Sequence, residues 1–70
     1  MEEIKTLEEK TLEAVVENCD VVRIVFTTGY QTLARIRDFD YTALLLEVEY
    51  KGEKREWMVY RHAVATIDLG

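Results

Sequence analysis

The stretch VVRIVFTTGYQTLARIRD, residues 21–38, decides the fold, because polar and apolar side chains alternate along it on both sides of a short break. Every second residue from Val22 to Phe26 is apolar and bulky, and the second half of the stretch alternates in the same way. Alternation with period two is typical of a half-buried β-strand. The break at Thr28-Gly29 is a short turn signal. The stretch therefore predicts an antiparallel hairpin, with strands at residues 21–27 and 30–38.

The same alternation continues towards the C-terminus in three more short segments, separated by Phe39-Asp40, Lys51-Gly52-Glu53 and Arg61-His62. No connection between the strands is long enough for a crossover helix, so the five strands are expected to form an antiparallel small barrel or a strongly bent sheet. Such a sheet has edge strands that recruit partners, and a closed ring of copies would pair every edge. The three further strands are predicted at residues 41–50, 54–60 and 63–69.

Upstream of the strands, the pattern changes to that of one amphipathic helix. Thr6 followed by Glu9 is a capping-box pattern, and Asn18 marks the expected helix end. We expect a helix over residues 6–18, and hence a mainly β domain with one N-terminal α-helix. An apolar stripe at helical spacing runs along it, made of Ile4, Leu7, Thr11 and Val15, with Leu12 and Ala14 beside them.

The length of the chain, 70 residues, allows one small core, and we expect a single domain over residues 1–70. Domains of this size usually gain support from disulfides, metal ions or self-association. Cys19 is the only cysteine and His62 the only histidine, which excludes an intramolecular disulfide framework and argues against a four-ligand structural zinc site. Self-association is the remaining route to stability.

No pattern in the chain indicates an enzyme. The sequence contains no serine, and Cys19 and His62 lie on separate predicted elements without a third group to orient them. Gly-rich phosphate loops are also absent from the sequence, so we predict no catalytic residue, no metal and no cofactor. No apolar run approaches the length of a membrane span and no targeting segment is recognisable, so we expect a cytoplasmic protein that does not contact membranes.

The acidity of the chain is concentrated in its first part. The formal net charge is −5, and residues 1–20 carry seven acidic against two basic side chains, whereas residues 21–70 carry equal numbers of each. An acidic helix above a neutral body weakens long-range attraction of nucleic acid. It does not prevent a local anion-binding site elsewhere on the molecule.

A helix followed by five bent strands, with VYRHAVATI at residues 59–67, resembles the bacterial Sm-like Hfq family. The resemblance runs from Thr6 to Ile67. Its most specific part is Tyr60-Arg61-His62, which matches the family's tyrosine, basic residue and histidine before the last strand. The resemblance implies an Sm-like fold, hexameric rings and the binding of single-stranded RNA, by which small regulatory RNAs are paired with messages. Weaker matches are Gly29, Phe39-Asp40 and Leu44-Leu45-Leu46-Glu47.

The resemblance also implies two RNA-binding faces. On the helix-bearing face, U-rich RNA lies around the pore, where Arg61 would donate to a uracil carbonyl or a phosphate and His62 to ribose or phosphate. Tyr60 would mainly join adjacent subunits. The implied pore-face positions are Tyr60, Arg61 and His62, together with Glu8, Tyr41 and Thr42. The opposite face, which takes A-rich RNA in the family, corresponds to Val25, Gly29, Tyr30, Leu33 and Thr66.

Several of these positions depart from the family pattern. Glu8 replaces a glutamine that contacts uracil, and a carboxylate cannot donate a hydrogen bond. Thr42 stands where the family has an aromatic stacker, and Tyr41 lies one position earlier, which reverses the face in a strand. Leu33 stands where a polar contact to adenine is often found. On the outer rim, Val16-Glu17-Asn18-Cys19 replaces a cluster of arginines.

These departures leave three alternatives open. One is that the A-rich site is retained while the pore site is lost. Arg61 could form an ion pair with Glu8 or Glu9 of a neighbouring subunit instead of binding RNA. The whole protein could be a divergent Sm-like ring that acts mainly as a protein-interaction scaffold and binds RNA only weakly.

Overall fold

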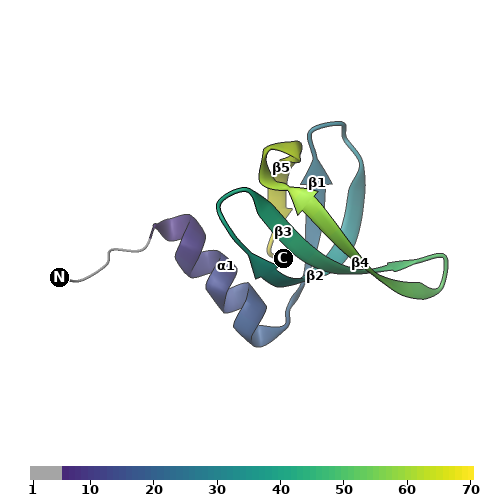
Figure 1. Cartoon of the computed structure of the whole chain (residues 1–70), viewed down its shortest axis with the longest axis horizontal. Helices are drawn as coiled ribbons and strands as arrows, with labels where there is room; N and C mark the ends of the chain where they lie inside the picture. Colours follow the sequence, from purple (N-terminus) through teal and green to yellow (C-terminus); the bar gives the residue numbers. More distant parts are fainter. Residues whose placement is uncertain (1–5) are drawn as a thin grey trace.

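A computed structural model describes residues 6–70, which form one helix and one antiparallel sheet (Figure 1). Every helix and strand limit lies within two residues of the sequence expectation. The 3₁₀ turn η1 replaces the break expected at Arg61-His62. The elements are α1 (Leu7–Asn18), β1 (Val21–Phe26), β2 (Gln31–Phe39), β3 (Ala43–Tyr50), β4 (Glu53–Tyr60), η1 (Arg61–Ala63) and β5 (Val64–Asp68).

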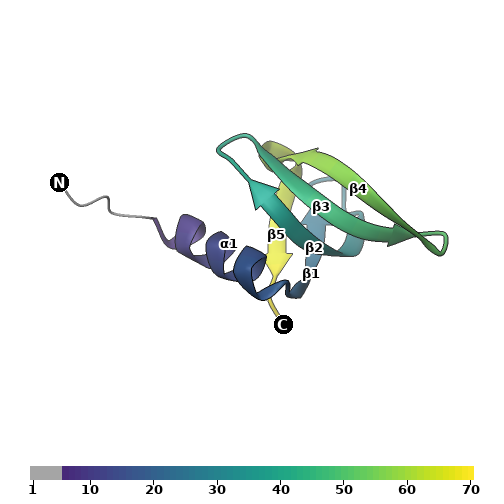
Figure 2. The ribbon, with the colours of Figure 1, turned by 60° about the horizontal axis from the view of Figure 1, so that its bottom comes forward.

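The sheet is open and strongly bent. Its strand order is β4-β3-β2-β1-β5, so β4 and β5 are the two edges and do not pair with each other. Both views show the sheet curving over itself (Figure 2), and α1 has its main contacts with β2. Of the two expected architectures, the bent sheet is therefore the correct one for a single copy, and the closed barrel is not formed.

The core lies on the concave face of the sheet, where alternate residues of the three central strands point inward. Two of these, Ile24 and Leu46, have no exposed surface. Burying a side chain of this size contributes about 1.5–3 kcal/mol. The complete set of buried side chains is Leu12, Val15, Val22, Ile24, Ala34, Ile36, Leu44, Leu46 and Val48.

Helix α1 adds Leu12 and Val15 to this core. The expected apolar stripe was too long at its N-terminal end, because Leu7 is 82% exposed. At that end the helix extends past the sheet, which leaves Leu7 without a surface to pack on (Figure 1). The proposed stripe member Ile4 lies outside the described residues. Among residues 6–70, no helix has the length and apolarity that crossing a bilayer requires.

Local hydrogen bonds fix both ends of α1. The Thr6 hydroxyl oxygen accepts a bond from the Glu9 backbone N–H at 3.1 Å, and the hydroxyl donates to the Glu9 carboxylate at 3.3 Å. The expected Thr6–Glu9 cap is therefore present. After Asn18 the chain reverses at Cys19, whose φ of 54° is left-handed and whose N–H bonds the carbonyls of Val15 and Val16. These caps set the direction from which α1 approaches β5.

Candidate nucleic-acid interface

The turn η1, which joins the two edge strands, is held by backbone hydrogen bonds on both sides. The Arg61 N–H donates to the Thr42 carbonyl at 2.8 Å, and the Ala63 carbonyl accepts from the Thr27 N–H at 2.8 Å. Residues at this turn are therefore fixed relative to the β2–β3 and β1–β2 connections. These two hydrogen bonds therefore hold the motif Tyr60-Arg61-His62 in place.

Two rings of the motif stack on each other at the surface. The ring centroids of Tyr60 and His62 lie 5.7 Å apart, with 17° between the ring planes. Tyr60 is 54% exposed, and His62 is exposed as well. An exposed, nearly parallel ring pair can offer a flat face to a nucleobase, and the imidazole N–H groups can donate to a ribose or a phosphate.

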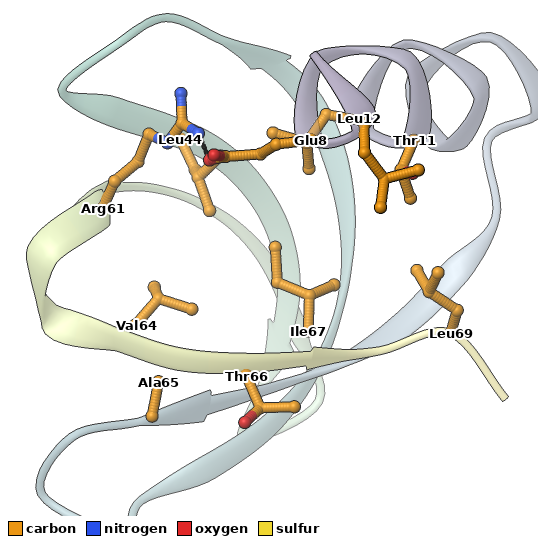
Figure 3. A pocket seen from close by; sticks show the side chains of 11 residues that line it. Glu8, Thr11, Leu12, Leu44, Arg61, Val64, Ala65, Thr66, Ile67 and Leu69 are labelled. Atoms are coloured by element: carbon orange, nitrogen blue, oxygen red, sulfur yellow. Dashed lines mark ion pairs between the residues drawn. The ribbon is translucent and has the colours of Figure 1, made fainter.

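Arg61, between the two rings in sequence, is held by two protein acceptors. One terminal nitrogen of its guanidinium forms an ion pair with the Glu8 carboxylate, and the other donates to the Asp40 carbonyl at 2.6 Å. Only 17% of the Arg61 side chain is exposed, against 62% for Glu8. Figure 3 shows the Glu8 side chain reaching from α1 towards the guanidinium. The ion pair forms within one chain. The alternative of a pair between Arg61 and Glu8 or Glu9 of a neighbouring subunit stays a prediction.

The connection between β2 and β3 is a tight turn built on Asp40. One oxygen of its carboxylate accepts bonds from the backbone N–H groups of Thr42 and Ala43, each at 2.8 Å, and from the Thr42 hydroxyl at 3.1 Å. The bond from the Thr42 backbone N–H is the main cause that lowers the pKa of Asp40, followed by the bond from Ala43. The turn leaves Tyr41 85% exposed and fixes the Asp40 carbonyl beneath Arg61.

A cavity of about 400 Å³ opens beside the Glu8–Arg61 pair, between α1 and β5. In Figure 3 the side chains of Leu12 and Ile67 point into it, whereas those of Ala65 and Thr66 point away from α1. The cavity is therefore largely apolar, with its charged pair at one end. Within the described part of the chain, no group of three or more His, Cys, Asp or Glu side chains could hold a metal ion.

The predicted pore-face residues thus gather in one region. Glu8 and Thr42 contact Arg61 directly, the first through its side chain and the second through its backbone carbonyl. Tyr41 belongs to the same turn as Thr42. The sequence indicated a structural role for Asp40, bonding backbone at the strand junction, but not the bond from Arg61 to the Asp40 carbonyl, because a backbone carbonyl has no residue signature.

The residues predicted for the opposite face are less closely grouped. Val25 pairs with Thr66 across β1 and β5, so these two side chains share one face of the sheet. Leu33 is 56% exposed and pairs with Arg23, the neighbour of Val25 on the same face. At the hairpin end, Gly29 has a φ of 92°, a conformation that favours glycine, and its N–H bonds the Phe26 carbonyl at 2.9 Å.

Tyr30 lies at the same hairpin but by alternation belongs to the core side of β2. Its ring tilts against that of Phe26 at a centroid distance of 5.8 Å, and it remains 51% exposed. Tyr30 therefore lies at the rim of the opposite face. It does not lie beside Leu33.

Comparison with known proteins identifies the family. The family model described as Hfq protein matches residues 7–69. The chain belongs to the Hfq family. It is also 39% identical over 64 residues to the RNA-binding protein Hfq of Natranaerobius thermophilus, covering 91% of this chain and 71% of that protein.

The fold agrees with a solved Hfq structure. A crystal structure described as the pleiotropic translational regulator Hfq superposes with a TM-score of 0.77 at 25% sequence identity, covering 90% of this chain and 98% of that one. The Hfq resemblance and the Sm-like fold expected from the sequence are therefore confirmed. The residues that the family model matches, 7–69, include α1, the strands of the sheet, and Tyr60, Arg61 and His62.

Proposed function

We propose that this Hfq-family chain forms a ring, with six copies as the expected number, and binds single-stranded U-rich RNA on the surface made by Tyr60, Arg61 and His62. The ring would act as an RNA chaperone in post-transcriptional regulation in the cytoplasm, one Sm-like domain per subunit. Each ring closes by pairing β4 of one copy with β5 of the next, because these are the two free edges of the sheet.

One observation carries the RNA site: an exposed ring pair, Tyr60 and His62, is fixed on either side of an arginine. Single-stranded RNA is bound by ring stacking, by cationic contacts to phosphate and by donors aimed at base edges. The turn η1 supplies all three kinds of group within consecutive residues. The exposed Tyr41 nearby adds a further ring.

Family membership favours RNA binding over the protein-scaffold alternative. The curated relative bears the name RNA-binding protein Hfq, and the structural neighbour is described as a translational regulator. The negative charge of α1 weakens long-range attraction of RNA, so RNA binding would depend mainly on local contacts. We therefore propose RNA as the main partner.

The test is a fluorescence-anisotropy titration of a labelled short oligouridine with wild-type protein and the double variant Arg61→Ala/His62→Ala. We expect the double variant to lose oligouridine binding while light scattering shows an unchanged ring. Affinity of the wild type should fall as salt rises, with log K decreasing by about 0.7 per phosphate contacted for each unit of log salt. Equal affinity of the two proteins would refute the site.

The opposite face is proposed as a second site for A-rich RNA. Its support is the shared surface of Val25, Thr66 and Leu33 beside the Gly29 hairpin. Competition between oligoadenosine and labelled oligouridine in the same titration separates the two sites. If the sites are distinct, oligoadenosine leaves oligouridine bound.

A further inference from the structure

The Glu8–Arg61 pair lies inside the proposed RNA site and uses the group that would bind the ligand. We infer that Glu8 lowers the RNA affinity of this site: its carboxylate is an internal competitor that RNA displaces from Arg61. The inference rests on the proposed function and concerns the same surface. It follows from the two acceptors that the Arg61 guanidinium already contacts in the free chain.

Both terminal nitrogens of Arg61 already have acceptors in the free chain, the Glu8 carboxylate and the Asp40 carbonyl. The guanidinium keeps further N–H donors, but only 17% of the Arg61 side chain is exposed, so a phosphate or a uracil carbonyl gains most access where one of these acceptors is replaced. A carboxylate and a phosphate compete directly, because each is an anionic oxygen acceptor that suits the planar fork of arginine.

Of the two acceptors, Glu8 is the one that can leave. The Asp40 carbonyl belongs to a turn closed by the carboxylate bonds to Thr42 and Ala43 and by the bond from the Asp40 N–H to the Ala43 carbonyl at 3.0 Å. Glu8, in contrast, is 62% exposed and lies in the first turn of α1, where it can turn into water without unfolding the helix. The Asp40 carbonyl would then continue to orient the arginine while the ligand takes the place of Glu8.

One consequence distinguishes a competitor from a simple surface charge. Removing the charge of Glu8 strengthens RNA binding specifically, whereas removing a neighbouring charge does not. The gain also shrinks as salt rises, because salt screens both the competition for Arg61 and the repulsion between Glu8 and phosphate. The free energy of an ion pair at the protein surface corresponds to an effect of about 1.4- to fivefold in affinity.

The matched variants are Glu8→Gln and Glu9→Gln. They make the same change of charge one residue apart in the first turn of α1, and Glu9 is engaged with Thr6 instead of Arg61. A glutamine at position 9 can still serve the capping box, so the control keeps the helix. Circular dichroism establishes that both variants are folded before they are compared.

The experiment measures oligouridine affinity of wild type, E8Q and E9Q from about 50 mM to about 200 mM salt. We expect E8Q to bind oligouridine up to about fivefold more tightly than E9Q at low salt, with the difference in affinity narrowing at high salt. Binding by E8Q but not by the wild type also supports the inference. Equal affinities of E8Q and E9Q, or weaker binding by E8Q, overturn it.

A second readout does not depend on RNA. Phenylglyoxal modifies accessible arginines, and peptide mass spectrometry can compare Arg61 with Arg55, whose side chain is 55% exposed and serves as the internal standard. We expect faster Arg61 modification in E8Q than in E9Q; equal rates refute the masking of Arg61 whatever the RNA result. If Arg61 is modified faster in E8Q but none of the three proteins binds oligouridine, the proposed RNA-binding function is refuted. The inference that Glu8 shields Arg61 is then still supported.

Discussion

At the scale of single residues, Asp40 shows how one carboxylate positions a site without belonging to it. Its side chain closes the β2–β3 turn, and its backbone carbonyl holds Arg61 at 2.6 Å. The charged form of the carboxylate accepts the turn bonds, and the bond from the Thr42 N–H is the largest cause of its lowered pKa. The stability of the turn is therefore linked to pH.

Because the pKa of Asp40 is lower in the folded than in the unfolded chain, its contribution is fully present above the unfolded pKa of about 4. It is lost as pH falls through the lower, folded pKa. In Asp40→Asn the amide oxygen can accept the same bonds without a charge. We expect wild type to have the higher thermal midpoint at neutral pH and the difference to vanish in acid. A difference that does not change with pH would contradict this linkage.

The residue scale is also where the sequence was least informative. The pattern placed Arg61 and His62 in a candidate site, but it did not show that Glu8 of the same chain occupies Arg61. The two residues lie at opposite ends of the sequence, and their meeting depends on how α1 is docked. Side-chain pairing of this kind follows from tertiary geometry, which periodicity does not encode.

At the scale of the elements, sequence periodicity predicted nearly everything. Alternation identified the inward residues of the central strands, such as Ile24 and Leu46, because a strand turns every second side chain to the same face. The capping pattern of Thr6 and Glu9 located the helix start to within one residue. Leu7 was assigned wrongly because a helical stripe says nothing about where the covering sheet ends.

The helix cap matters to the site, because Thr6 fixes the turn of α1 that carries Glu8. Thr6→Ala removes the acceptor for the Glu9 N–H and should lower the free energy of unfolding by about 1 kcal/mol in urea denaturation. Thr6→Ser keeps a hydroxyl and serves as the control, with stability close to wild type. Equal loss in both variants would show that the methyl group, and not the cap, is responsible.

At the scale of the whole molecule, the open sheet of a single copy has two edge strands that ring assembly would pair. Both edges, β4 and β5, lack a partner strand within the described chain, and β4 carries the large exposed side chains of Met58 and Tyr60. Exposed apolar residues on an unpaired edge favour association. The turn η1 joins these two edge strands, so Tyr60, the last residue of β4, belongs both to an edge that would pair in the ring and to the proposed RNA site.

Tyr60 can therefore be assigned by experiment to assembly or to RNA binding. If it joins subunits, Tyr60→Ala removes an aromatic side chain from an interface and should raise the concentration for half-assembly about tenfold, measured by light scattering over a dilution series. Tyr41→Ala removes a more exposed ring that lies in the β2–β3 turn and not on an edge strand, and this variant should leave assembly unchanged. A Tyr60→Ala ring that stays intact but binds oligouridine more weakly would instead assign the ring stack with His62 to the RNA. The stack is formed within one chain, so every subunit of the ring would contribute one Tyr60–His62 pair.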